Sequence, residues 1–146
     1  MKTLTYKTNI NASPEKIWNC LLDEEKYKIW TAPFCPGSYY KTKAMEVGNR
    51  IHFLNPEGGG MYSTINSLIP NREVSFLHIG EIKNFEEMPL DSESEKWTNA
   101  LEKYEIIHHG TYCELCITME ILDEYSEYMD QSFPLALDEL KRISEA

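Results

Sequence analysis

The C-terminal stretch from Asp123 to Ala146 constrains the fold more than any other part of the chain. Its apolar side chains recur at three- and four-residue intervals, which places them along one stripe of a helix. They are Tyr125, Tyr128, Met129, Phe133, Ala136, Leu137, Leu140 and Ile143. A long helix with one apolar stripe needs a partner that covers it, and most of the preceding chain is predicted to form strands. The pattern therefore predicts a curved antiparallel sheet around a C-terminal helix, with any space between them as the candidate site.

One residue inside this predicted helix opposes its continuity. Pro134 lacks a backbone N–H and its ring crowds the carbonyl four residues earlier, at Asp130. Either the helix kinks near Asp130, or its regular part begins at Pro134 with Ser132 nearby as a cap. We favour the kink.

The N-terminal part of the chain predicts one strand followed by two short helices. Apolar and polar residues alternate from Thr3 to Ile10, as in a strand with one covered face. Ser13 then supplies a helix cap, and Pro14 stands at the first helical position, where its missing N–H costs nothing. The helical pattern restarts after Asp23, so we expect a second short helix that begins there and ends at Trp30.

The rest of the chain before the final helix predicts a meander of antiparallel strands separated by turns that contain Gly, Pro or Asn. The expected strands are a short one at Tyr39-Tyr40 and longer ones at 50–54, 61–69, 74–80, 97–108 and 112–122. In the last of these, the apolar face that includes Cys113 and Met119 should look at the final helix. The segment 81–96 is rich in acids and interrupts the pattern, so we expect an exposed, mobile acidic loop there.

Length and charge limit what the protein can do. A chain of 146 residues fits one domain, which we place at 1–146. The formal net charge of −10 opposes binding to nucleic acid and to anionic membranes. No run is apolar enough for a signal peptide or a membrane span, and the four scattered cysteines read as reduced thiols. These features predict a cytoplasmic protein.

The order of the predicted elements is the α+β helix-grip arrangement: one strand, two short helices, a meander that brings the sheet to about six or seven strands, and a long C-terminal helix. At this point the chain resembles the START-like (SRPBCC) superfamily, of Bet v type, and within it the family of activators of the heat-shock-protein-90 ATPase. The matching segments are Ala12-Ser13-Pro14-Glu15-Lys16-Ile17-Trp18, Lys28-Ile29-Trp30, Gly48, and Phe133-Pro134 followed by Leu137 and Leu140-Lys141.

This resemblance covers nearly the whole chain, but it rests on packing motifs and not on catalytic ones. It implies a cavity between sheet and helix, in which members of the superfamily hold lipids, hormones, polyketides or other apolar molecules. It also implies a protein partner as a second expectation, since the family is named for an activator of a chaperone ATPase. The acidic loop is longer than the family's minimal hairpin.

Two groups of residues have side chains suited to a zinc site or to a catalytic carboxylate pair, but their spacing along a strand argues against both. His108, His109, Cys113 and Cys116 are of the types that bind zinc. Cys113 and Cys116 are three apart on a strand, however, so their side chains point to opposite faces, and we expect no metal site. The same spacing separates Glu102 from Glu105, which excludes them as a concerted carboxylate pair. We therefore assign no catalytic residue and expect no cofactor.

His78 is the most interesting single residue, because it alternates onto the same face as Val74 and Phe76. An imidazole in an apolar cavity could orient a ligand or exchange a proton with it. The alternative, which we favour, is a histidine that is hydrogen-bonded within the sheet.

The aromatic residues are more informative as a set, because they come from elements that would meet around one cavity. We expect the wall of a ligand-binding cavity to consist of Trp30, Phe34, Tyr40, His78, Tyr104, Met119, Met129 and Phe133. Within this wall, His78 or Tyr40 would supply the polar contact to the ligand. The predicted function is non-catalytic binding of a small hydrophobic molecule. A protein-interaction module is the first alternative. An enzyme of the cyclase or aromatase type is the second, and it requires an open cavity in which His78 faces another polar group.

Overall fold

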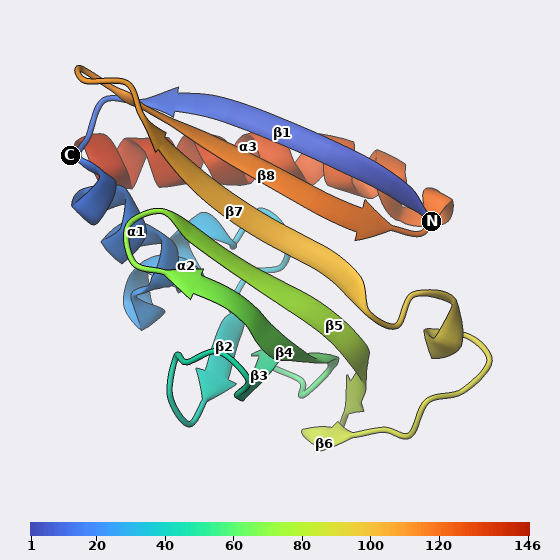
Figure 1. Ribbon diagram of the computed structural model, residues 1–146. Helices are drawn as coiled ribbons and strands as arrows, with labels where there is room; N and C mark the ends of the chain where they lie inside the picture. Colours follow the sequence, from blue (N-terminus) through green and yellow to red (C-terminus); the bar gives the residue numbers. More distant parts are fainter.

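A long helix lies against one face of an antiparallel sheet, and two short helices cover the end of that face (Figure 1). The computed structural model describes residues 1–146. The strands are β1 (Lys2–Ile10), β2 (Tyr39–Thr42), β3 (Arg50–Leu54), β4 (Gly60–Ile69), β5 (Glu73–Lys83), β6 (Glu86–Glu87), β7 (Ala100–His108) and β8 (Cys113–Ile121). The helices are α1 (Pro14–Leu22), α2 (Glu24–Trp30) and α3 (Ser126–Glu145), with two short 3-10 turns, η1 (Ser94–Lys96) and η2 (Asp123–Tyr125). The predicted helix-grip architecture is confirmed.

The sheet joins the first strand of the chain to the last. Its order is β1-β8-β7-β5-β4-β3-β2, and the short β6 pairs with β5 outside this path. The β1–β8 pairing runs from Lys2 opposite Ile121 to Ile10 opposite Cys113. In Figure 1 the chain leaves β8 near the start of β1 and then runs along α3, so that the C-terminus comes to lie beside α1. The terminal helix is therefore held against strands from both ends of the sequence.

The two short helices begin at the predicted caps. The Ser13 hydroxyl oxygen accepts a hydrogen bond from the Lys16 backbone N–H at 3.1 Å, and Pro14 is the first helical residue. Asp23 does the same for α2, where its carboxylate accepts from the Lys26 N–H at 3.2 Å. Two short helices joined at Asp23 are thus confirmed.

The core forms between the inner face of the sheet and one side of α3. Phe133, Ala136, Leu137 and Leu140 of α3 are buried, as are Cys113, Leu115, Ile117 and Met119 of β8, and all eight belong to one hydrophobic cluster. The dry face of the last strand does look at the final helix, as predicted. No helix in the structure is both long enough and apolar enough to cross a bilayer.

Helix α3 differs from the predicted stripe at its start. It is continuous through Pro134, so a regular helix that begins at Pro134 is wrong, whereas the kink near Asp130 stays a prediction. Pro134 is exposed, and water can reach the carbonyl that its ring leaves without a donor. Tyr125 and Tyr128 are 51% and 43% exposed. These two positions of the stripe therefore face solvent, although β1 still runs beside the first turn of α3, where the Tyr6 hydroxyl donates to the Asp130 carboxylate at 2.6 Å.

The predicted acidic loop 81–96 is more ordered than its composition indicates. Strand β5 continues to Lys83, and Ile82 is buried in a small second cluster with Leu54 and Tyr62. Glu86–Glu87 then pairs with β5, and Ser94 is buried. The pairing of β6 with β5 and the burial of Ile82 order this segment despite its acidic composition. The next strand starts at Ala100 instead of Trp97, because Trp97 to Asn99 form a turn in which Asn99 has a φ of 67°.

The packing of α3 leads to a matched pair of substitutions. Leu140 is fully buried, so Leu140→Ala should lower the free energy of unfolding by about 2–5 kcal/mol. Leu135 lies on the same helix but is 58% exposed, so Leu135→Ala should change it by less than about 0.5 kcal/mol. Urea unfolding followed by circular dichroism measures both. Equal effects would show that α3 does not use this face to hold the sheet.

Candidate functional site

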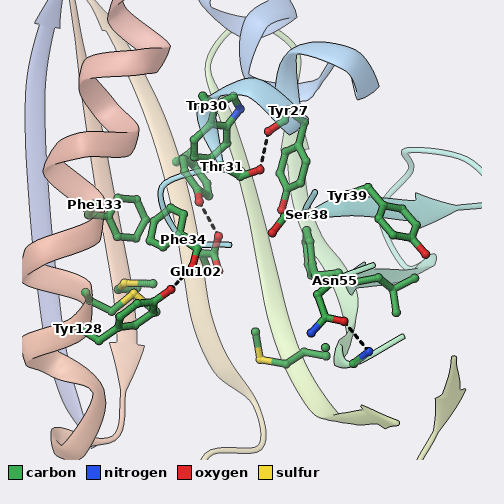
Figure 2. Close-up of a pocket in the computed structure, with 18 residues that line it drawn as sticks. Tyr27, Trp30, Thr31, Phe34, Ser38, Tyr39, Asn55, Glu102, Tyr128 and Phe133 are labelled. Atoms are coloured by element: carbon green, nitrogen blue, oxygen red, sulfur yellow. Dashed lines mark hydrogen bonds between the residues drawn. The ribbon is translucent and has the colours of Figure 1, made fainter. Parts of the chain in front are cut away.

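A cavity of about 250 Å³ lies between α2, the loop after it, α3 and the sheet. Its wall is mainly hydrophobic and carries eight aromatic rings, from Tyr27, Trp30, Phe34, Tyr39, Phe53, Tyr104, Tyr128 and Phe133. In Figure 2, Tyr128 and Phe133 project from α3 on one side, while Tyr39 and Asn55 stand on the opposite side. The cavity is therefore formed by elements that are far apart in the sequence and that only the folded sheet brings together.

The rings of the wall pack against one another, which makes it stiff. Phe34 and Phe133 meet edge to face with their centroids 4.8 Å apart, and Trp30 meets Tyr104 in the same way at 6.0 Å. The Trp30 indole N–H donates to the Leu21 carbonyl at 3.1 Å, which fixes this ring in the wall. Aromatic pairs in such contacts hold their orientation, so the space between them is largely preformed.

One side of the cavity is closed by a hydrogen bond between two elements. The Tyr128 hydroxyl of α3 donates to the Phe34 carbonyl in the loop that follows α2 (Figure 2). Tyr128 is 43% exposed, so this bond lies where the cavity meets solvent. The loop is held to α3 by this bond and by the contact of Phe34 with Phe133.

A second cavity of about 280 Å³ adjoins the first. The two share part of their walls, namely Gly60, Met61, Glu102, Met119 and Met129. The second is also lined by His78 and Trp97. Glu102 is the one charged residue that borders both spaces, and Figure 2 shows it well inside the first.

Glu102 belongs to a chain of polar side chains built on three neighbouring strands. Ser63 Oγ lies 2.6 Å from Nδ1 of His78, and Nε2 of His78 lies 2.9 Å from Oε1 of Glu102. The Tyr104 hydroxyl donates to Oε2 of Glu102 at 2.5 Å. The order along the sheet is thus Ser63 on β4, His78 on β5, and Glu102 with Tyr104 on β7.

Strand register explains why these groups meet. A bulge between Tyr62 and Ser63 brings Ser63 directly opposite His78. His78 lies opposite Ala100 on β7, so Glu102 is its diagonal neighbour, at a separation that long side chains can span. Tyr104 is two residues further along β7 and therefore on the same face as Glu102.

The hydrogen bonds and charges within this group of polar side chains keep the Glu102 carboxyl ionised. Burial alone would raise the pKa of the Glu102 carboxyl, but the hydrogen bond and charge of His78 and the hydrogen bond from Tyr104 bring it below its usual value. Burial, followed by the Glu102 charge, raises the pKa of the Tyr104 hydroxyl well above its usual value. The same two causes raise the pKa of Tyr27. Glu102 is therefore a carboxylate held among neutral phenols.

His78 is hydrogen-bonded within the sheet, as the favoured interpretation predicted. It is only 6% exposed, and both ring nitrogens have a partner. It nevertheless lines the second cavity. His78 is therefore both hydrogen-bonded within the sheet and part of a cavity wall, two roles that the sequence analysis treated as alternatives.

The structure brings most of the predicted wall residues together. Six of the eight line the first cavity, namely Trp30, Phe34, Tyr104, Met119, Met129 and Phe133. His78 lines the second cavity, together with Met119 and Met129. Tyr40 lines neither, because it borders a void of about 10 Å³ and its hydroxyl donates to the Leu22 carbonyl. The charged group that the first cavity offers is Glu102, and Tyr40 is not among its polar residues.

The sequence contained a signal for Glu102 that the comparison with Glu105 concealed. Glu102 alternates with Ala100, Tyr104 and Ile106, all buried, so a carboxylate stands on the dry face of β7. Its distance from Glu105 excluded a carboxylate pair, correctly, since Glu105 lies on the other face beside Lys103. A single acid on the apolar face of a strand indicates a buried carboxylate that needs hydrogen-bond donors. Tyr27 and Met61 had no comparable signal.

The grouping of histidines and cysteines considered for zinc does not converge. Cys113 is buried and its thiol donates to the Ala12 carbonyl at 3.4 Å, whereas Cys116 alternates onto the opposite face. No group of three or more His, Cys, Asp or Glu side chains in the structure has the geometry to hold a metal ion.

Comparisons with known proteins support the fold. No protein-family model matches the sequence, and no curated protein matches it either. Among solved structures, the chain is similar to the Aha1 dimer from Colwellia psychrerythraea, at 23% identity and a TM-score of 0.71, over 99% of this chain and 97% of that one. It is also similar to protein MLL2253 from Mesorhizobium loti, at 15% identity and a TM-score of 0.72, over 97% and 96% of the two chains. Protein CV1439 from Chromobacterium violaceum matches at 16% identity and a TM-score of 0.71, over 100% and 99%. At these identities the likeness shows the fold, and for the fold the resemblance indicated by the sequence motifs is confirmed.

The buried phenols predict how stability depends on pH. The folded protein keeps the protons of Tyr104 and Tyr27 at a pH where the unfolded chain loses them, near the ordinary tyrosine pKa of about 10. Raising the pH past that value therefore favours the unfolded state, and the free energy of unfolding should fall. Tyr27→Phe and Tyr104→Phe should each make this alkaline fall shallower, whereas Tyr125→Phe, at an exposed position, should leave it unchanged. Urea unfolding between pH 8 and 11 tests this, and an unchanged slope in both buried variants contradicts it.

Proposed function

We propose that the chain is an Aha1-like member of the START-like superfamily that binds a small, mainly apolar molecule, without catalysis, between the sheet, α2 and α3. The observation that carries the proposal is the ring-lined cavity beside a second one, with Glu102 between them. Binding sites for small molecules are mostly apolar, largely preformed and equipped with a few fixed polar groups. The wall described above has all three properties.

The size of the cavities favours a compact ligand. Ligand pockets usually measure about 300–1,000 Å³, and the two spaces here are about 250 and 280 Å³. Together they suit a ligand of a few rings or one short chain, and they are too small for a lipid with two long chains. Of the apolar molecules that the resemblance implies, the smaller ones fit this protein best.

The enzymatic alternative required an open cavity in which His78 faces another polar group, and both conditions are met. However, Ser63 and Glu102 occupy the two nitrogens of His78, so neither nitrogen is free for a substrate. Ser63 is fully buried and lines neither cavity, which excludes it as a nucleophile despite its place in a Ser–His–Glu chain. His78 therefore serves to orient Glu102, and binding without chemistry is the better account.

The interaction module is the second candidate function. Segment 81–96 extends from the end of β5 (Figure 1) and carries exposed acids, including Glu81, Glu86 and Asp91. A partner with a basic surface would suit it, and binding would then weaken steeply with added salt. The ring-lined cavity plays no part in such docking, so this candidate leaves the most distinctive feature of the molecule unused.

Filling the cavity tests the main proposal. Native mass spectrometry of the protein purified from its own host should show a small molecule that travels with it. Met129 lines both cavities, so Met129→Trp should occupy the space and reduce the bound fraction at least about tenfold, as a loss of about 1.4 kcal/mol in affinity would.

The matched control introduces the same side chain on the outer side of the same helix. Leu135→Trp should bind as the unmodified protein does, because Leu135 is 58% exposed. Equal ligand retention in the two variants, both shown to be folded by circular dichroism, would contradict binding in this cavity.

A further inference from the structure

The charges around the two cavities all have the same sign. Glu102 is the only charged residue that lines the first cavity. The second adds Glu81 and Glu120, and neither cavity has a lysine or an arginine in its wall. Lys83 lies 3.3 Å from Glu81, and Glu120 accepts a hydrogen bond from the Leu101 N–H at 2.9 Å, but both of these acids line the second cavity alone. Glu102 is the acid that a ligand in either space would meet.

The hydrogen bonds of Glu102 orient its carboxylate without using its full capacity. Each oxygen accepts one bond, Oε1 from His78 and Oε2 from Tyr104. A carboxylate has about four acceptor positions, so each oxygen can accept a further donor. The side chain is still 18% exposed, which leaves a route to it from the cavity.

Both contacts of His78 can be made in either protonation state, and a protonated His78 lowers the pKa of Glu102 by its charge. The Ser63 hydroxyl can donate to Nδ1 of His78 while the N–H at Nε2 donates to Glu102, so that a neutral imidazole satisfies both contacts. Tyr104 donates from the other side as a neutral phenol. With His78 neutral the group carries one negative charge among aromatic rings, and a buried charge of this kind gains most from a partner of opposite sign.

We propose that the ligand carries a protonated amine or a similar cationic group that pairs with Glu102, while its apolar part packs between the rings of Trp30 and Phe133. This inference rests on the proposed binding function and adds the chemical class of the ligand. The aromatic wall favours the same class, because the faces of tryptophan and tyrosine rings attract cations. A fatty acid or another apolar anion would instead bring a second carboxylate towards Glu102, and the site excludes it.

Three probes of the same shape and different charge test the inference on the unmodified protein. They are naphthylmethylamine, naphthylmethanol and naphthoate, which at neutral pH are a cation, a neutral molecule and an anion. Titration calorimetry at low ionic strength should show the amine binding at least about tenfold more tightly than the alcohol, since a charge-assisted hydrogen bond replaces a neutral one. The naphthoate should bind most weakly.

Two substitutions on β7 assign the preference to one side chain. Glu102→Gln keeps the shape and removes the charge, so the amine and the alcohol should then bind within about threefold of each other. Glu105→Gln makes the same change on the opposite face of the same strand, beside Lys103, and should keep the preference of the unmodified protein. If Glu102→Gln does not fold, the three-probe comparison on the unmodified protein still decides the question.

The outcomes separate the inference from the function on which it rests. Tight binding of the amine, with the preference lost only in Glu102→Gln, supports both. Equal binding of the three probes, or tightest binding of naphthoate, overturns the cationic ligand and leaves the proposed cavity function in place. Binding of none of them, together with a protein that carries no small molecule from its host, overturns both.

Discussion

The contact between α3 and the inner face of the sheet is the interaction on which the rest of the structure depends. Phe133, Ala136, Leu137 and Leu140 cover the buried side of the strands, and no other helix crosses them along their length. Apolar burial of this kind is the main favourable term in folding. Because β1 pairs with β8, the same helix also ties the start of the chain to its end. The cavity lies beside this contact, along the N-terminal part of α3 that includes Tyr128, Met129 and Phe133.

The polar chain from Ser63 to Tyr104 is the least expected feature of this core. A single buried carboxylate is costly unless it is hydrogen-bonded, and each neighbour here supplies a bond. An apolar residue at position 102 would leave Nε2 of His78 and the Tyr104 hydroxyl without this partner. Because Glu102 also lines both cavities, this polar chain links the interior of the sheet to the space in which we propose that a ligand binds.

Much of the fold could be predicted from local patterns. Local patterns include the serine and aspartate caps, the strand alternation and the apolar stripe of α3. Each of them involves residues close together in the chain, so its effect can be predicted from the sequence. The predictions from local sequence were wrong where contacts with residues distant in the sequence outweigh the local composition. Strand β5 extends into the acidic segment because Ile82 packs against Leu54 and Tyr62, and Tyr125 and Tyr128 are exposed although their spacing continues the apolar stripe. For the site, most of the predicted wall residues line one cavity, whereas Glu102 was considered only as half of a pair.

The sequence by itself determined the order of the elements, the dry face of β8 and the central part of the buried stripe of α3, from Phe133 to Leu140, because periodicity and capping are local properties. Only the tertiary structure decided which polar groups meet. The bulge at Ser63 and the diagonal register of His78 and Glu102 depend on how three strands align, and no short stretch of sequence encodes that alignment. The volume of the cavity was likewise decided by the tertiary structure, because it is the space left when side chains from α2, α3 and five strands have packed.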